Sequence, residues 1–294
     1  MTVDSEERLY LLFGKPAQVV SLKMDGTDMQ TIVADASGTP DGIAVDAVNG
    51  YVYWTNMGDD YAANDGYIER VRIDGTGRQF VVPPGGTHTP KQMFLDLPRN
   101  LMYWCDREGM RVMRAKTDGS EITVLVQTGT TGVDSHDETR HCVEIAIDLA
   151  MGHIYWTQKG PPNGKKGRIF RAGIDLPAGE QADARSDIEV VFDGLPEPID
   201  LEIDHAGHYL YWTDRGDPPD GNTLNRTKLV HAATGVHEIL SGGLQEGIGL
   251  TLTKSNVIFT ADLGGFVRRF DGPNFEKSAV VVSLAAMLTG IAHA

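Results

Sequence analysis

The sequence has little positive charge and very little cysteine. Its 294 residues contain 26 Lys and Arg against 41 Asp and Glu, which gives a net charge of −15 at pH 7. Proteins that bind nucleic acid neutralise phosphates with clustered basic side chains, and the sequence contains no such cluster, so nucleic acid is not an expected partner. The same charge disfavours anionic membrane surfaces. The two cysteines, Cys105 and Cys142, are too few for a disulfide framework.

Long hydrophobic runs are also absent from the sequence. No stretch of about 18 consecutive apolar residues occurs, so no transmembrane helix is predicted. Residues 1–7 (MTVDSEE) are acidic and lack the basic and apolar parts of a signal peptide. Together these absences predict a cytoplasmic protein. The composition, with 41% hydrophobic and 23% charged residues, is ordinary for a globular chain, and we expect one repeat-built domain over residues 1–294.

An internal repeat is the strongest feature that the sequence does contain. In five segments a short apolar stretch, in most copies ending in Asp, is followed by an aromatic stretch. The aromatic stretches are residues 53–56 (YWTN), 103–106 (YWCD), 155–158 (YWTQ), 211–214 (YWTD) and 258–261 (IFTA). All four tryptophans of the chain occupy the same position of the repeat, and we align Phe259 with them in the fifth copy.

Each repeat is predicted to form four short antiparallel strands. The apolar stretch, a tight turn and the aromatic stretch give the first two strands. A third strand carries an Arg at a fixed place and is often followed by Asp-Gly, as at residues 74–75 and 118–119. Asp-Gly favours a two-residue hairpin because both positions tolerate positive φ. A β-branched fourth strand completes the unit, and such units arranged around an axis are the blades of a β-propeller.

The two ends of the chain supply a sixth unit. Residues 9–13 resemble the aromatic strand and residues 19–26 resemble the third strand and its turn. Residues 290–294 (GIAHA) copy the first-strand pattern of residues 42–46 (GIAVD). We therefore expect an all-β fold, a six-bladed β-propeller of four-stranded antiparallel blades, whose ring is closed by the C-terminal strand pairing with the N-terminal strands. Such closure removes open sheet edges.

The repeat resembles the YWTD repeats, or class B repeats, of the low-density-lipoprotein-receptor family over nearly the whole chain. The shared features are the strand-ending Asp, the Tyr-Trp-Thr-Asp strand, the Arg of the third strand and the Asp-Gly turn. The chain departs from the pattern at Cys105, which stands for Thr, and at Asn56, Gln158 and Ala261, which stand for the final Asp. The resemblance implies the propeller fold and a structural role for the motif residues. It implies no particular function, because function depends on sites carried by the fold.

One face of the predicted propeller carries the long connections. Turns from the first to the second strand and from the third to the fourth share one face and are mostly short; we call it the short-turn face. Loops from the second to the third strand and the crossovers between blades lie on the long-loop face. Its longest segments are residues 59–65, 127–141, 160–166 and 217–221. Because loops on a rigid scaffold often carry function, we expect the binding site on this face.

The first strands predict a ring of polar side chains around the central channel. At the position of Gly42 the other blades have Gln92, Glu144, Asp200, Gly249 and Gly290, and Glu202 lies two residues after Asp200. Strand side chains alternate between two sides, so these polar groups are predicted to face the channel near its long-loop mouth. Crowded carboxyl groups raise one another's pKa, and a raised pKa suits acid–base catalysis near neutral pH.

Polar residues that precede the first strands are expected at the same mouth. The predicted catalytic residues are His141 and Glu144 as a proton-transfer pair, together with Glu202 and His136. The predicted substrate-binding residues are Asp41, His88, Lys91, Gln92, Arg140, Asp200 and Glu246. Convergent polar groups in a concave site are typical of a small-molecule site, and a channel whose polar groups hold only water is the alternative.

Three functions are compatible with this pattern. The first is an intracellular small-molecule enzyme that uses acid–base chemistry, as a lyase, isomerase, cyclase or hydrolase, with secondary metabolism as one setting. The second is a non-catalytic propeller that binds a protein or peptide on the long-loop face. The third is a lactonase-like hydrolase with a divalent metal ion in the channel mouth. No fixed-spacing metal motif such as His-Glu-x-x-His occurs, so no metal or other cofactor is predicted for the first function.

Overall fold

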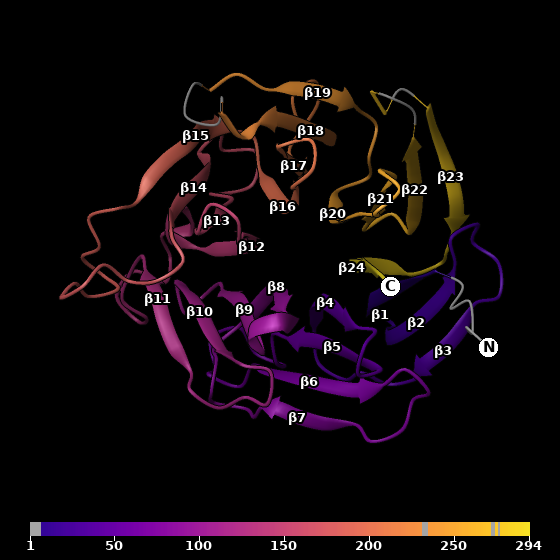
Figure 1. Ribbon diagram of the computed structural model, residues 1–294, viewed down its shortest axis with the longest axis horizontal. Helices are drawn as coiled ribbons and strands as arrows, with labels where there is room; N and C mark the ends of the chain where they lie inside the picture. The colour runs from indigo at the N-terminus through magenta and orange to yellow at the C-terminus, as the bar shows by residue number, and fades with distance from the viewer. Residues whose placement is uncertain (1–6, 231–234, 272–273, 276) are drawn as a thin grey trace.

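The computed structural model describes residues 7–230, 235–271, 274–275 and 277–294. These residues form an all-β ring of six four-stranded antiparallel sheets, which confirms the predicted six-bladed propeller (Figure 1). The first six residues of the acidic N-terminal segment lie outside the described residues. In the part of the chain that is described, no helix is long and apolar enough to cross a membrane.

In each blade the first strand lies next to the central axis and the fourth lies at the rim (Figure 1). From the axis outwards, the strands of blades 1 to 3 are β24 (Met287–His293), β1 (Arg8–Lys15), β2 (Ala17–Lys23) and β3 (Gln30–Val33); β4 (Pro40–Asp46), β5 (Tyr51–Asn56), β6 (Tyr67–Arg72) and β7 (Gln79–Val82); and β8 (Pro90–Asp96), β9 (Leu101–Asp106), β10 (Arg111–Lys116) and β11 (Thr123–Gln127). The strands of blades 4 to 6 are β12 (Cys142–Asp148), β13 (His153–Gln158), β14 (Gly167–Gly173) and β15 (Glu189–Leu195); β16 (Pro198–Asp204), β17 (Tyr209–Asp214), β18 (Thr223–Lys228) and β19 (Glu238–Ser241); and β20 (Gly247–Leu252), β21 (Ile258–Asp262), β22 (Phe266–Asp271) and β23 (Lys277–Ser283). Two 3-10 helices, η1 (Leu97–Arg99) and η2 (Glu138–Arg140), lie between β8 and β9 and before β12.

The ring closes as the sequence predicts, because blade 1 is built from both ends of the chain. Strand β24 pairs with β1, with Leu9 opposite His293 and Leu11 opposite Ile291. The backbones of Arg8 and Ala294 add two hydrogen bonds of 2.8 and 3.1 Å beyond the strand. The indigo and yellow ends of the chain accordingly lie side by side in Figure 1.

The repeat positions are preserved in three dimensions in four blades. The tryptophans Trp54, Trp104, Trp156 and Trp212 lie opposite Ile43, Met93, Ile145 and Leu201 of the neighbouring inner strands, and all four are buried. The third-strand arginines lie opposite the motif tyrosines, as Arg70 lies opposite Tyr53 with a hydrogen bond of 3.0 Å to its hydroxyl.

In blade 6 the predicted alignment of the aromatic strand is wrong by one residue. The residue opposite Leu250 is Thr260, so no aromatic residue occupies the tryptophan position, and Phe259 lies opposite Arg269 at the tyrosine position. The final position belongs to Asp262, whose carboxylate accepts the N–H of Gln245. The register of a strand is set by which of its side chains face the core. Because the two residues before Thr260 are both apolar, the sequence does not show which of them faces the core.

A bulge at the start of the inner strands is held by the threonine of the motif. In β12 both Val143 and Glu144 lie opposite Thr157, because the register shifts between Cys142 and Ile145. The Thr157 hydroxyl accepts the N–H of Glu144 at 3.1 Å and donates to the carbonyl of Ile199 in the next blade at 3.0 Å. The motif threonine therefore fixes the bulge and joins neighbouring blades at the same time.

The same two bonds recur around part of the ring. Thr55 accepts the N–H of Gly42 at 2.8 Å and donates to the Lys91 carbonyl at 2.6 Å. Thr213 accepts the N–H of Asp200 at 3.2 Å and lies 3.4 Å from the Ile248 carbonyl. The carbonyl groups immediately before the channel-facing residues are thus hydrogen-bonded to the preceding blade. These bonds fix the position of the inner strands relative to the axis.

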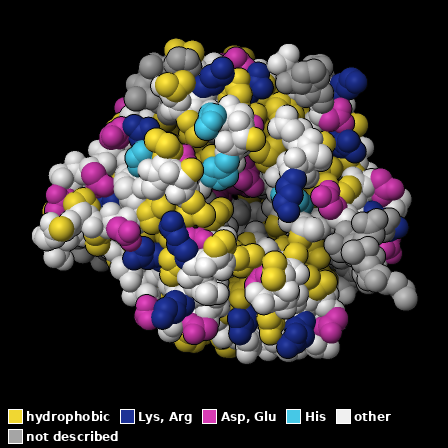
Figure 2. All heavy atoms as spheres, viewed as in Figure 1, with side chains coloured by type: hydrophobic (Ala, Val, Ile, Leu, Met, Phe, Trp, Pro, Cys, Tyr) yellow, Lys and Arg dark blue, Asp and Glu magenta, His cyan; other side chains and the backbone are white. Residues whose placement is uncertain are grey.

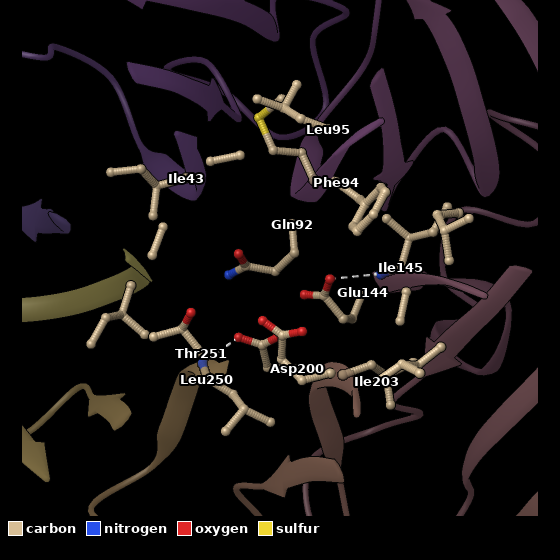
Figure 3. Close-up of a pocket in the computed structure, with 18 of the residues that line it drawn as sticks. Ile43, Gln92, Phe94, Leu95, Glu144, Ile145, Asp200, Ile203, Leu250 and Thr251 are labelled. Atoms are coloured by element: carbon tan, nitrogen blue, oxygen red, sulfur yellow. Dashed lines mark hydrogen bonds between the residues drawn. The ribbon is translucent and has the colours of Figure 1, made fainter. Parts of the chain in front are cut away.

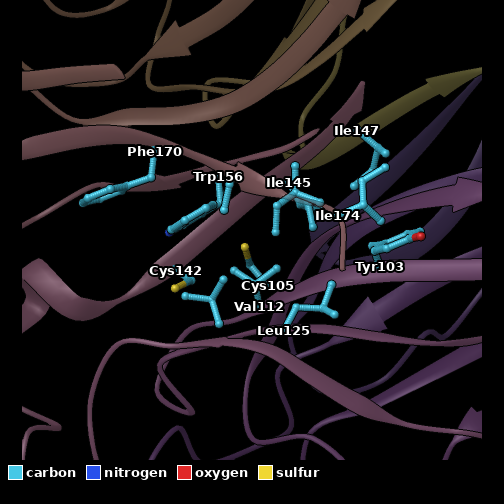
Figure 4. Close-up of a cluster of buried hydrophobic side chains, with 13 residues drawn as sticks. Tyr103, Cys105, Val112, Leu125, Cys142, Ile145, Ile147, Trp156, Phe170 and Ile174 are labelled. Atoms are coloured by element: carbon cyan, nitrogen blue, oxygen red, sulfur yellow. The ribbon is translucent and has the colours of Figure 1, made fainter. Parts of the chain in front are cut away.

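The hydrophobic core lies between adjacent blades. Figure 4 shows the cluster between blades 3 and 4, where Trp156 stacks on Phe170 with ring centroids 5.2 Å apart. Cys105 and Cys142 belong to this cluster as buried free thiols. The fold is therefore stabilised by apolar burial between sheets, and the inner strands remain available to line the axis.

Candidate functional site

A cavity of about 230 Å³ lies at the centre of the ring. All six inner strands contribute to its lining, and Gln92, Glu144, Asp200 and Glu202 are among the lining residues (Figure 3). Most of the remaining wall is apolar. The alternation inferred from the sequence thus predicts correctly which side of each inner strand carries these four polar groups.

The cavity opens toward the short-turn face. Its lining follows the inner strands to their C-terminal ends and includes His293 of β24 and His205 in the turn between β16 and β17. Figure 2 shows the molecule hollowed at its centre, with acidic side chains inside the hollow and histidine side chains beside it.

The expectation that the acids lie at a long-loop mouth is therefore wrong. On the long-loop side of the acids, Val143, Ile199 and Ile248 are buried and pack together across the axis. They precede the channel-facing residues of β12, β16 and β20, and none of them lines the cavity. The bulge explains the difference, since it turns two successive residues of an inner strand inward, the apolar one nearer the long loops and the polar one below it.

Glu144 and Asp200 are buried at the floor of the cavity and face one another (Figure 3). Glu144 Oε1 accepts its neighbour's N–H, that of Ile145, at 2.8 Å, and a carboxylate oxygen of Asp200 accepts the N–H of Leu250. Burial, followed by the charge of Asp200, raises the pKa of Glu144 well above its usual value. Burial, followed by the charge of Glu202, does the same to the pKa of Asp200.

Glu202 lies two residues after Asp200 in β16 and completes a group of three carboxyl side chains. Burial raises its pKa to about 7, although backbone hydrogen bonds from Leu252 and Ile203 oppose the shift. Glu144 Oε2 is buried and receives no hydrogen bond from the neutral groups around it. Because burial raises all three pKa values, and neighbouring carboxyl groups add to the shifts of Glu144 and Asp200, the group retains protons at neutral pH.

The neutral side chains around the acids are fixed by hydrogen bonds. The Gln92 amide donates to the Thr289 carbonyl at 2.9 Å, which links β8 to β24 on the other side of β4. Thr251 Oγ1 and His293 Nδ1 are 2.8 Å apart, and burial lowers the pKa of His293. The His293 imidazole is thus held neutral at the cavity wall, where it offers a hydrogen bond but no positive charge.

The predicted histidines lie on the other face. His136 and His141 line a separate pocket of about 280 Å³ with Arg107, Glu108, Ser135, Glu138 and Lys159. His141 Nε2 is 3.1 Å from the Ser135 carbonyl, and burial lowers the pKa of His141. The predicted proton-transfer pair of His141 and Glu144 is therefore divided between two sites, with Val143 and its apolar neighbours between them.

The other predicted substrate-binding residues also lie outside the cavity lining. Asp41 and Lys91 form a buried ion pair, and burial lowers the pKa of Lys91. His88 Nε2 contacts the Tyr61 carbonyl at 3.0 Å. Arg140 pairs with Asp137 at 3.0 Å within its own loop, and Glu246 is exposed. These contacts organise the long-loop side, and they place none of these residues against a molecule in the central cavity.

The residues present do not fit a metal centre. Within the described ranges, no group of three or more His, Cys, Asp or Glu side chains is placed to hold a metal ion. The described residues therefore offer no set of metal ligands for the lactonase-like hydrolase considered in the sequence analysis.

Three contributors to the site were missed in the sequence. Thr157 positions Glu144, and its signal was the constant threonine of the repeat. His293 stands where the other inner strands have Val45, Ile147 or Ile203, so a polar residue at an apolar repeat position was the available signal. His205 lies in a turn whose sequence gives no indication of the cavity beside it.

Comparison with known proteins gives two extensive sequence matches. No protein-family model matches the chain. It is 42% identical to the low-density lipoprotein receptor-related protein 1 of Pyricularia oryzae, over 99% of both chains. It is 36% identical to the 3-hydroxyacyl-CoA dehydrogenase-like protein LAM1 of Cochliobolus heterostrophus, over 95% of this chain but only 61% of that longer protein.

Solved structures agree with the fold. A chain in the crystal structure of a nidogen/laminin complex superposes with a TM-score of 0.75 and 20% identity, over 98% of both chains. A gluconolactonase from Xanthomonas campestris superposes with a TM-score of 0.62 and 15% identity, over 85% of this chain and 78% of that one. At these identities the structural matches show the fold alone.

Proposed function

The chain belongs to the family of YWTD-repeat six-bladed propellers, and within it we propose that this protein is an intracellular enzyme whose central cavity binds a small organic molecule and protonates it. The proton donors are the buried carboxyl groups of Glu144 and Asp200 and the half-buried carboxyl group of Glu202. The reaction is of the lyase, isomerase, cyclase or hydrolase type, in which an alkene, a carbonyl or a leaving group receives a proton.

One observation carries this proposal: three carboxyl side chains share a cavity whose described lining contains no Lys or Arg. A general acid works best when its pKa is close to the working pH, and the pKa of Glu202 is raised to about 7. Buried acids whose environments raise their pKa are common at catalytic sites, although structural networks also produce such shifts. Here the floor opens into a cavity, which a purely structural network does not need.

The cavity itself supports a small substrate. Its volume of about 230 Å³ lies below the roughly 300–1,000 Å³ of pockets that hold drug-sized ligands. Apolar walls exclude water from the carboxyl groups and strengthen every electrostatic interaction inside. The two free thiols, Cys105 and Cys142, support an intracellular setting, because reducing compartments keep cysteines unpaired.

The long-loop pocket is a weaker candidate for a binding site. Its charged groups are largely paired with one another: Arg107 with Glu108 at 2.6 Å, and Lys159 with the neighbouring acids Glu197 at 3.0 Å and Glu138 at 3.8 Å. A site with internally satisfied charges gains little from a charged ligand, because binding would have to break those pairs.

The test is a comparison of turnover by matched variants. The chain, Glu144→Gln and Glu202→Gln would each be incubated with a mixture of small metabolites, with Asp59→Asn as the charge-matched control in an exposed loop. Mass spectrometry should show compounds consumed by the chain and by the control and at least tenfold more slowly by the two acid variants. The rate should fall as pH rises through about 7, because Glu202 loses its proton there.

Two results would contradict the proposal. The first is consumption of no compound by the unmodified chain. The second is loss of turnover in His141→Ala with full turnover in both acid variants, which would move the reaction to the long-loop pocket.

A further inference from the structure

Building on the proposed function, we infer that the molecule taken into the central cavity is an organic cation: a small amine with a compact apolar body, whose ammonium group lies against Glu144, Asp200 and Glu202. This names the substrate class of the same site. The inference rests on the charge of the floor, an acid oxygen that the neutral groups around it leave without a donor, and the size and polarity of the walls.

Among the described residues, the cavity lining contains no Lys or Arg side chain that could balance the charge of the three acids. Of the described residues that line the cavity, five are titratable, namely Glu144, Asp200, Glu202, His205 and His293, and none is Lys or Arg. The side chains that β4, β8 and β20 contribute to the lining are uncharged. His205 is half exposed at the rim and lies 3.8 Å from Asp148, outside the acid group. The three acids can therefore be neutralised only by protons or by a cation that enters the cavity.

One acid oxygen receives no N–H or O–H from the neutral groups around it. Glu144 is only 3% exposed, its Oε1 accepts the Ile145 N–H, and its Oε2 has no donor partner while it faces the interior of the cavity (Figure 3). In the free cavity a proton is shared between this carboxyl group and that of Asp200, and when that proton leaves, the buried oxygen needs another donor. An ammonium group has three donors and a positive charge, so it can bond this oxygen and the carboxyl of Asp200 opposite it together.

The walls fit a hydrocarbon body attached to that ammonium group. Ala44, Phe94, Ala146 and Ala292 line the cavity on the same side of the inner strands as the acids. The volume of about 230 Å³ equals that of about eight water molecules at their liquid volume. A body of one small ring or a short branched chain fills this space, whereas a polyamine or a peptide terminus would leave charges or amides against hydrocarbon.

Other ligand classes fit less well. An anion would meet three acids and no Lys or Arg side chain in the described lining. A metal ion would need three or more converging ligands, which the described residues do not supply. A neutral molecule would leave the acids protonated and gains only the apolar contacts, so it is expected to bind more weakly than a cation of the same shape.

Cation binding is coupled to proton release in this arrangement. The acids carry protons when the cavity is free, and an ammonium ion displaces one proton to solvent as it binds. Below the pKa of about 7 at Glu202, affinity for the cation should therefore rise about tenfold per pH unit. Above pH 7 the rise should level off, and one of the remaining protons stays available for the proposed chemistry.

The experiment compares three probes of one shape: benzylamine, benzyl alcohol and benzoate. Isothermal titration at pH 6, 7 and 8, in buffers of different ionisation enthalpy, measures affinity and the protons released. Benzylamine should bind at least tenfold more tightly than benzyl alcohol at pH 7, with nearly one proton released at pH 6 and fewer at pH 8. Benzoate should show no binding. Glu202→Gln should lower benzylamine affinity about tenfold and reduce proton release, and Asp59→Asn should change neither.

The outcomes separate this inference from the proposed function. Equal affinity for the amine and the alcohol, or an amine affinity independent of pH, would overturn the inference; the pH series needs no variant, so it stands even if Glu202→Gln does not fold. Turnover of uncharged compounds without amine binding would leave the proposed function intact. Amine binding with the predicted pH dependence, in a chain that consumes no compound, would support the cation site and contradict the enzyme.

Discussion

The thiol of Cys105 donates a hydrogen bond to the backbone carbonyl of Glu144, 3.1 Å away in the next blade. In the neighbouring blades a motif threonine donates instead to the carbonyl one residue earlier, as Thr157 does to Ile199, which precedes Asp200. This departure from threonine in blade 3 thus lies directly behind the most shielded acid of the cavity, and it uses a weaker donor.

Cys105→Thr should be tolerated and should raise the free energy of unfolding by about 1 kcal/mol, since a hydroxyl makes a stronger hydrogen bond than a thiol. Cys105→Val has nearly the same shape and no donor, so it should unfold more readily than the threonine variant. Urea titration of both proteins measures the difference. Equal stability of the two variants would show that the bond to Glu144 contributes nothing.

Thr157→Val should destabilise the protein by about 1–3 kcal/mol, because it leaves the N–H of Glu144 and the carbonyl of Ile199 buried without their partner. The same change at Thr31, which is exposed in β3, is the control and should shift stability by less than about 0.5 kcal/mol. Thermal denaturation of both variants checks this. A Thr157 variant as stable as the control would mean that the bulge is held by packing alone.

Glu202→Gln should stabilise the protein at high pH. The pKa of this buried acid is raised from 4.5 to about 7, so the folded state binds more protons than the unfolded state between those values. The free energy of unfolding therefore falls as pH rises from about 4.5 to 7, and the total loss above pH 7 is roughly 3 kcal/mol. The neutral variant escapes this loss, so its gain in unfolding free energy should be large at pH 8 and small at pH 5. A gain of equal size at both pH values, against Asp59→Asn as control, would contradict the assignment.

Glu197→Gln should cost about 3–5 kcal/mol, because the buried carboxylate pairs with Lys159 at 3.0 Å and Arg215 at 2.7 Å and its loss leaves two cations unmatched. Glu238→Gln removes an exposed partner of Arg226 and should cost less than about 1 kcal/mol. Chemical unfolding of the two variants measures the contrast. Similar small costs at both positions would show that solvent compensates the charges near Glu197.

The blade pattern could be predicted from the sequence because local chemistry and the repeat agree. Alternation along the inner strands placed Gln92, Glu144, Asp200 and Glu202 on the channel side, and the C-terminal copy of the first strand predicted ring closure. Each of these inferences needs only the period of a strand and the comparison of equivalent positions.

The direction in which the cavity opens could not be predicted, because it depends on a backbone irregularity. The bulge adds an inward-facing residue before Glu144, Asp200 and Gly249, and these added residues, Val143, Ile199 and Ile248, pack together on the long-loop side as a result. A bulge leaves no clear mark in a single sequence. The long loops then suggested the wrong face, and residues such as His136 and His141 were grouped with acids that lie beyond an apolar layer.

The pairing of β24 with β1 makes the cavity depend on the completion of blade 1. Ile291, Ala292 and His293 form one wall of the central cavity. While β24 is unpaired, the barrel of inner strands has a gap, so the acids remain hydrated and the pocket stays open at the side. The protein therefore has an interior able to hold a guest only after strands that are far apart in the sequence have paired.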